Sequence, residues 1–194
     1  MRRNEFLLAP LIAALTALAV FTSSLVTAAP IRAEEFTCRG TVGARTVDNL
    51  RVPDGATCTL KGTKVKGTIK VERRATLFAY GVRVIGNVQA ENARKVVVAR
   101  SSRVGGSVQV VQSGVAKVRG SRINGNILFD DNSGLNVARR NVVGGDVQAF
   151  QNTGGVRIYS NRIDGNLQCK QNSPRPVGDH NVVQGNKEDQ CRRF

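Results

Sequence analysis

Apolar and polar residues alternate in short runs along most of the chain after residue 33, and valine is frequent in these runs. Alternation over four or five residues predicts short β-strands with one buried face. The runs repeat, because a glycine recurs every 19 or 20 residues, and each of these glycines except the last is followed by apolar residues two and four positions later. These glycines are Gly67, Gly86, Gly106, Gly125, Gly145, Gly165 and Gly185. Such a period predicts stacked units that bury their apolar faces only against their neighbours.

Alignment on the glycines gives columns of residues that we expect to point inward. The column two residues after each glycine contains Ile69, Val88, Val108, Ile127, Val147 and Leu167. The column two residues before the next glycine contains Val65, Val84, Val104, Ile123, Val143, Ile163 and Val183. A third segment supplies the pairs Leu77/Ala79, Val96/Val98, Ala116/Val118, Leu135/Val137 and Val156/Ile158. The spacing from this segment to the next glycine slips by one residue in alternate coils, which we interpret as a bulge or corner.

The sequence therefore predicts an all-β fold, a single-stranded parallel β-helix with about 20 residues and three short strands per coil. We expect about seven coils between Cys38 and Cys191. A further column, four residues before each glycine, becomes asparagine at Asn141, Asn161 and Asn181. Stacked asparagines at a bend can hydrogen-bond to one another and to the turn backbone, so we interpret this column as structural.

The N-terminus has the three parts of a secretory signal peptide. Arg2 and Arg3 precede an apolar stretch over residues 6–21, and Val26-Thr27-Ala28 offers a small-residue cleavage site. We expect residues 1–28 to be the signal, 29–37 a short lead-in, 38–191 the β-helix and 192–194 a tail. The apolar stretch is shorter than the roughly 20 residues of a spanning helix, so no membrane span is expected in the mature form. The expected location is secreted, periplasmic or in the cell envelope.

Four cysteines lie in two pairs near the ends of the predicted β-helix, with separations close to one coil. They are Cys38, Cys58, Cys169 and Cys191. Three connectivities are possible, and the separations favour Cys38–Cys58 with Cys169–Cys191 on adjacent coils. Disulfides persist in the oxidising compartment that an exported protein enters. A metal site is the competing interpretation, but no pair has C-x-x-C spacing and His180 is the only histidine.

Two features of the sequence carry a resemblance to a known fold. They are the repeated Gly-(Asn/Ser/Asp)-(Val/Ile/Leu)-Gln phrase and the ending Gly185-Asn186-Lys187-Glu188-Asp189-Gln190-Cys191. The chain over residues 58–191 resembles the right-handed parallel β-helix, or pectate-lyase-like, superfold. Within that superfold it resembles more closely small secreted bacterial β-helix proteins of unassigned function. This resemblance implies a right-handed helix and leaves the activity open.

The chain is strongly basic, with a formal net charge of +15. Seven basic residues and no acid lie between Asn92 and Phe129. Two predicted outward columns carry arginine in or just before this stretch: Arg83, Arg103 and Arg122 three residues before a glycine, and Arg100 and Arg119 six residues before one. These five arginines are the candidate binding site for an anionic polysaccharide or envelope polymer. Nucleic acid is a second candidate partner, supported only by the positive charge. The alternative interpretation is that these residues form a solvated basic face that binds no polymer.

Two other function classes remain open. Polysaccharide lyases and hydrolases on this superfold use clustered carboxylates, and the candidate catalytic residues here are Asp146 and Asp164 on neighbouring coils. A structural or self-assembling envelope protein is the third class. We expect no cofactor and no metal, and we favour a binding protein over an enzyme.

Overall fold

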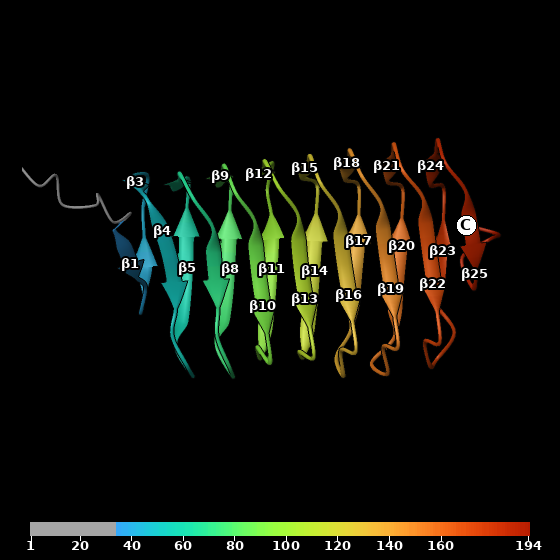
Figure 1. The fold of residues 1–194 in the computed structure, drawn as a ribbon, viewed down its shortest axis with the longest axis horizontal. Coiled ribbons are helices and arrows are strands. Elements are labelled where there is room, and N and C mark those ends of the chain that lie inside the picture. The colour runs from blue at the N-terminus through green and yellow to red at the C-terminus, as the bar shows by residue number, and fades with distance from the viewer. Residues whose placement is uncertain (1–33) are drawn as a thin grey trace, which may run out of the picture. The chain divides into compact units, whose positions relative to one another are not determined.

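The computed structural model describes residues 34–194 of the chain, so the expected signal peptide and cleavage site lie outside the described residues. Those residues form strands and turns, with three parallel sheets and no helix (Figure 1). The chain passes through sheets A, B and C in turn in every coil. This confirms the predicted parallel β-helix with about 20 residues and three strands per coil, and with about seven turns.

The three sheets contain nine, eight and eight strands. Sheet A consists of β1 (Glu35–Thr37), β4 (Asn49–Val52), β7 (Ile69–Val71), β10 (Val88–Glu91), β13 (Val108–Val111), β16 (Ile127–Asp130), β19 (Val147–Phe150), β22 (Leu167–Lys170) and β25 (Lys187–Asp189). Sheet B consists of β2 (Thr41–Val42), β5 (Thr57–Lys61), β8 (Thr76–Tyr80), β11 (Lys95–Ala99), β14 (Val115–Arg119), β17 (Asn136–Arg139), β20 (Val156–Tyr159) and β23 (Val177–Asp179). Sheet C consists of β3 (Thr46–Val47), β6 (Lys64–Val65), β9 (Arg83–Val84), β12 (Arg103–Val104), β15 (Arg122–Ile123), β18 (Val142–Val143), β21 (Arg162–Ile163) and β24 (Val182–Val183). Strand β1 falls within the stretch 29–37 that the sequence pattern assigned to a lead-in.

The core is a single stack of apolar side chains inside the three sheets. The columns that begin with Ile69 and Val65 are in parallel register and almost all buried, and Phe129 is the largest fully buried side chain. Each residue packs on its counterparts in the coils above and below, so burial depends on neighbouring coils.

One inward pair predicted in the third segment is wrong. Asn136 and Ala138 point inward and are fully buried, whereas Val137 lies in the outward column and Leu135 is half-buried. The Nδ2 of Asn136 donates to Asn152 Oδ1 at 3.1 Å and to the carbonyl of Gly134 at 3.0 Å, whereas its buried Oδ1 has no hydrogen-bond partner among residues 34–194. A polar residue therefore occupies a core position that the apolar pattern assigned to its neighbours.

The predicted slip of register in alternate coils is also wrong. Only one coil carries an extra residue at the corner between sheets B and C, and the residues there are Arg100 and Ser101. Both have left-handed backbone, with φ of 59° at each. The equivalent corners use a single left-handed residue, such as Gly81 or Gly120. The insertion leaves the strands on both sides in their common register.

The asparagine column at the same corner forms the predicted hydrogen-bonded ladder. The N–H of Asn141 donates to Asn161 Oδ1 at 3.1 Å, and the N–H of Asn161 donates to Asn181 Oδ1 at 3.0 Å. A second buried ladder, which the sequence analysis missed, lies between sheets A and B at Asn132, Asn152 and Asn172. These amides satisfy buried backbone groups where the chain turns, which holds the coils in register.

Both disulfides have the favoured pairing. Cys38 is bonded to Cys58 with a Cα–Cα distance of 5.6 Å, and Cys169 is bonded to Cys191 with one of 5.3 Å. Each bond joins adjacent coils at one end of the described solenoid, where a coil has a neighbour on only one side. The metal interpretation of these cysteines is excluded because all four thiols are oxidised.

Candidate anion-binding surface

The first basic column predicted from the sequence lies on the outer surface of sheet C. The short strands β6, β9, β12 and β15 pair in parallel, with Lys64 opposite Arg83, Arg83 opposite Arg103 and Arg103 opposite Arg122. We call these four residues the basic stripe. Each is followed by a buried apolar residue, Val65, Val84, Val104 or Ile123, so all four charged side chains point to solvent. Val142 continues the column and ends the run of charge.

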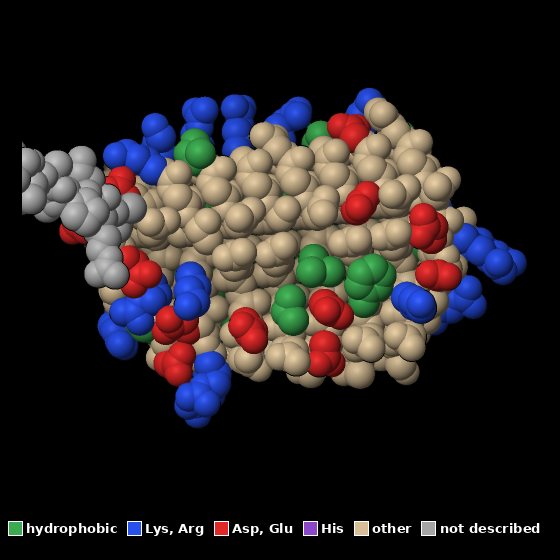
Figure 2. Space-filling view, viewed as in Figure 1, with side chains coloured by type: hydrophobic (Ala, Val, Ile, Leu, Met, Phe, Trp, Pro, Cys, Tyr) green, Lys and Arg blue, Asp and Glu red, His purple; other side chains and the backbone are tan. Residues whose placement is uncertain are grey.

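The basic stripe is not neutralised by the protein. Among residues 34–194, none of its four side chains has a carboxylate oxygen within 4.0 Å. The carboxylates of sheet C lie at its two ends, where Asp48 is 3.0 Å from Lys66 and Asp164 is 3.9 Å from Arg162. Figure 2 shows Lys and Arg side chains in a row along the upper edge of the molecule, where the strands of sheet C lie in Figure 1. Adjacent strands are about 4.8 Å apart, so neighbouring stripe cations repel one another unless an anion intervenes.

Shallow depressions lie on both sides of the Arg103–Arg122 step. One is floored by Val104 and Gly105 and bordered by Ile85 and Asn124. The other is lined by Ser101, Ser102, Gly120, Ser121, Arg140 and Val142. Both depressions include Arg103 and Arg122 in their linings. An anionic group seated in either depression would meet guanidinium donors from two successive coils.

Gly105 keeps the first depression open. A Cβ at this position would lie 2.2 Å from the backbone oxygen of Ile85, so the close approach of the two coils requires glycine here. The missing side chain leaves a gap in the column between Ile85 and Asn124.

Arg140 is a site residue that the sequence analysis missed. It follows the last residue of β17, has left-handed backbone with φ of 54°, and lines the second depression beside Arg122. Its position is equivalent to Gly120 in the preceding coil. The glycines at 62, 81 and 120 mark this corner in earlier coils, and that spacing could have identified Arg140 as a corner residue.

The second predicted basic column is wrong at one residue. In sheet B, Tyr80 pairs with Ala99 instead of Arg100, while Arg119 pairs with Arg139 and Arg139 with Tyr159. Arg100 lies at the inserted corner, and its Cζ is 4.7 Å from the centroid of the Tyr80 ring. A guanidinium stacked on a ring keeps its N–H edge available, so Arg100 remains a donor but in a different place from the one predicted.

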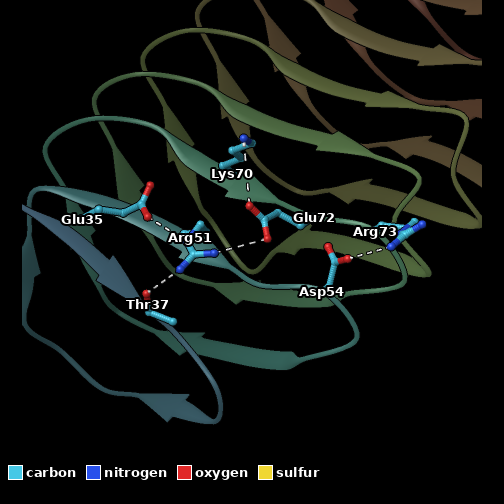
Figure 3. Close-up of polar contacts among 7 residues, drawn as sticks. All are labelled: Glu35, Thr37, Arg51, Asp54, Lys70, Glu72 and Arg73. Atoms are coloured by element: carbon cyan, nitrogen blue, oxygen red, sulfur yellow. Dashed lines mark hydrogen bonds and ion pairs between the residues drawn. The ribbon is translucent and has the colours of Figure 1, made fainter.

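Charge crowding extends onto sheet B. Burial lowers the pKa of Lys117, and the nearby charges of Arg119 and Lys95 lower it further. The two smaller contributions to this shift come from basic neighbours on the same sheet. By contrast, Arg51 on sheet A is bonded to Glu35 at 2.7 Å and to Glu72 at 3.4 Å (Figure 3). Basic residues at that end of sheet A are therefore neutralised within the protein.

The alternative catalytic residues lie at the corner before sheet A, and Asp146 has a structural partner. Its Oδ1 accepts the backbone N–H of Asn166 at 2.7 Å. The preceding member of this column, Asn126, accepts the N–H of Asp146 at 2.8 Å in the same way. Asp146 is thus one rung of a ladder that stacks the turns after the glycines. Asp164 is exposed beside Arg162.

Within residues 34–194 no group of three or more His, Cys, Asp or Glu side chains is placed to hold a metal ion. The same residues include no helix long and apolar enough to cross a membrane. The fold and these surfaces define a disulfide-capped parallel β-helix with a basic outer stripe. No protein-family model, curated protein or solved structure matches the chain.

Proposed function

We propose that this protein binds an anionic polymer of the cell envelope through the basic stripe and does not cleave it. The observation that carries the proposal is the register of Arg83, Arg103 and Arg122, which stack on successive coils without a carboxylate partner among the described residues. Guanidinium groups bind carboxylate, sulfate and phosphate through paired hydrogen bonds. A repeat of about 4.8 Å per coil suits an extended polymer with regularly spaced charges.

The site in this proposal comprises the basic stripe, with Lys64, Arg83, Arg103 and Arg122, together with Arg140. Arg100 and Arg119 lie around the corner on sheet B and add positive potential beside it. The two depressions give charged groups of the polymer a seat between arginines of adjacent coils. Because each exposed ion pair contributes little, affinity must come from several contacts made together.

An envelope polymer is favoured over nucleic acid by the compartment. The two disulfides indicate an oxidising environment. Together with the secretory signal expected at residues 1–28, they support export, and export brings the protein into contact with acidic polysaccharides and other envelope polymers.

The test is a calorimetric binding screen with the purified, disulfide-bonded protein. The probes are alginate, pectate, a sulfated glycosaminoglycan, teichoic acid, lipopolysaccharide and DNA. We expect at least one envelope-type polymer to bind at low ionic strength and its affinity to fall steeply as NaCl rises, because several ion pairs are screened together. Absence of binding to every probe at low salt would refute the proposal.

The same incubations separate binding from cleavage. A lyase or hydrolase would release unsaturated or reducing ends, with or without added calcium, and Asp146→Asn or Asp164→Asn would abolish them. The hydrogen bond from Asn166 to Asp146 supports a structural role for that carboxylate. We therefore expect no product. Concentration-dependent oligomers without polymer affinity would instead support the structural, self-assembling class.

A further inference from the structure

The outer surface of sheet B is a second basic surface, and it differs in kind from the basic stripe. Its two central outward columns are Thr59, Phe78, Val97, Lys117, Val137, Arg157 and Val177, and Lys61, Tyr80, Ala99, Arg119, Arg139, Tyr159 and Asp179. We call this surface the sheet B face. Between β5 and β20 its strands contain no acidic residue, and Asp179 enters only at β23.

Cations and apolar side chains are interleaved on this face. Lys117 lies between Val97 and Val137 in one column, and Arg139 lies between Arg119 and Tyr159 in the other. Phe78 and Tyr80 stand side by side, with ring centroids 6.2 Å apart. Lys95 Nζ is 5.2 Å from the centroid of Phe78. Val97 and Val137 are themselves buried between their neighbours, so the apolar surface of this face comes from the partly exposed rings of Phe78, Tyr80 and Tyr159. The face therefore combines positive charge with aromatic surface over several coils.

The shape of the face limits the partner. The strands β5, β8, β11, β14, β17 and β20 lie side by side in one row (Figure 1). The basic and apolar residues spread across both columns and along roughly 19 Å from β8 to β20, at about 4.8 Å per strand. A single polymer chain touches a line of residues, whereas a planar surface can touch the whole array at once.

We propose that the sheet B face docks on a bilayer surface rich in anionic lipid headgroups. Lys and Arg near such a surface are attracted by its negative potential. The partly exposed phenylalanine and tyrosine rings among them can enter the boundary between headgroups and acyl chains. The outward side of sheet A does not offer this combination, because it carries Glu72, Glu91 and Asp130. The protein then lies with its long axis along the membrane, and the basic stripe is on an adjacent face.

The sequence contains no tryptophan, so single-tryptophan reporters can measure which face meets the lipid. Phe78→Trp places the reporter on the sheet B face, and Phe150→Trp places a matched reporter on the outward side of sheet A. With phosphatidylglycerol-containing vesicles we expect a blue shift and quenching by brominated lipid for Phe78→Trp alone. Equal shifts at both positions, or no shift at Phe78→Trp, would overturn the proposal.

Charge variants provide the second measurement. Lys117→Gln/Arg139→Gln/Arg157→Gln removes three charges from the sheet B face, and Arg83→Gln/Arg103→Gln/Arg122→Gln removes three from the stripe. We expect the first triple variant to reduce partitioning onto anionic vesicles roughly a hundredfold, and the second to reduce it much less. Equal losses, or equal binding to pure phosphatidylcholine vesicles, would overturn the proposal. The first variant keeps the stripe, so its binding to soluble anionic polymer tests the proposed function separately.

Discussion

Arg103 on β12 and Arg122 on β15 lie directly opposite each other in neighbouring coils, both exposed and neither within 4.0 Å of a carboxylate among residues 34–194. The pairing follows from the strict period of the core. Val104 and Ile123 pack in the same register inside the sheet, and the strand alternation then aligns the two arginines outside it. Apolar burial thus holds together two like charges that repel each other.

The first prediction concerns the cost of that repulsion. Arg103→Gln removes one charge from between Arg83 and Arg122, so we expect the melting temperature at low ionic strength to rise by roughly 1–2 °C. The gain should vanish in 1 M NaCl because the repulsion is screened. Arg193→Gln at the C-terminal tail serves as the control and should leave the melting temperature unchanged both at low ionic strength and in 1 M NaCl. A fall in melting temperature at low salt would show that Arg103 is stabilised by contacts that outweigh the repulsion.

The second prediction concerns the buried asparagine ladder. Asn161→Ala removes the hydrogen bond that the N–H of Asn141 donates to the side chain and the bond that the side chain donates to the carbonyl of Ala138, and both groups lie on buried residues. We expect unfolding free energy to fall by about 2–4 kcal/mol, as measured by denaturant titration. The matched control is Asn124→Ala on the exposed surface of the same solenoid, which should cost less than about 0.5 kcal/mol. Similar losses from both variants would contradict a specific role for the ladder.

The third prediction concerns the reason for the glycine that recurs every 19 or 20 residues. A Cβ at Gly145 would lie 1.9 Å from Asn126 Oδ1, which accepts the N–H of Asp146. Gly145→Ala must therefore displace this ladder, and we expect a loss of about 2–3 kcal/mol. Gly120 has φ of 54°, and a Cβ added there would meet nothing within 4 Å, so Gly120→Ala should cost only about 1 kcal/mol, from left-handed backbone strain. Thermal melts of both variants show which substitution destabilises the protein more. A larger loss for Gly120→Ala than for Gly145→Ala would be inconsistent with a steric role for Gly145.

The fourth prediction concerns the end staples. Each disulfide closes a loop of about one coil, and the chain-entropy account assigns about 3 kcal/mol to a loop of this size. Replacing either cysteine pair by alanine should lower unfolding free energy by that amount and promote aggregation, because the terminal coils then open their strand edges more often. Unchanged stability and solubility after reduction would show that packing alone holds the ends.

The fold was predictable from sequence because one signal, the glycine-centred period, specified strands, inward columns and stacking together. Val88, Val108 and Val147 were placed correctly for this reason. Asn136 was not, because a buried amide is recognisable only once its partner Asn152 is known. The pattern favoured its apolar neighbours instead.

The site was predictable only in part. The stripe on sheet C follows from the same period, whereas Arg100 was misplaced because an extra corner residue leaves the strand pattern unchanged on both sides. Arg140 went unnoticed because a left-handed corner position has no hydrophobic signature. The sheet B face was also missed, since the outward position of Phe78 depends on pairing with Val97 in the next coil.

The most direct test of the proposed function compares two double variants of equal charge. Arg103→Gln/Arg122→Gln disrupts the centre of the basic stripe, and Arg192→Gln/Arg193→Gln removes the same charge near the C-terminus. Titration calorimetry with the tightest-binding polymer of the screen, at low salt, gives the affinity of each. We predict that the stripe variant loses roughly tenfold or more, because two charge-assisted contacts disappear, while the tail variant stays within about twofold of the parent. Equal loss in both variants would show that net charge alone attracts the polymer, and would contradict a specific binding site on sheet C.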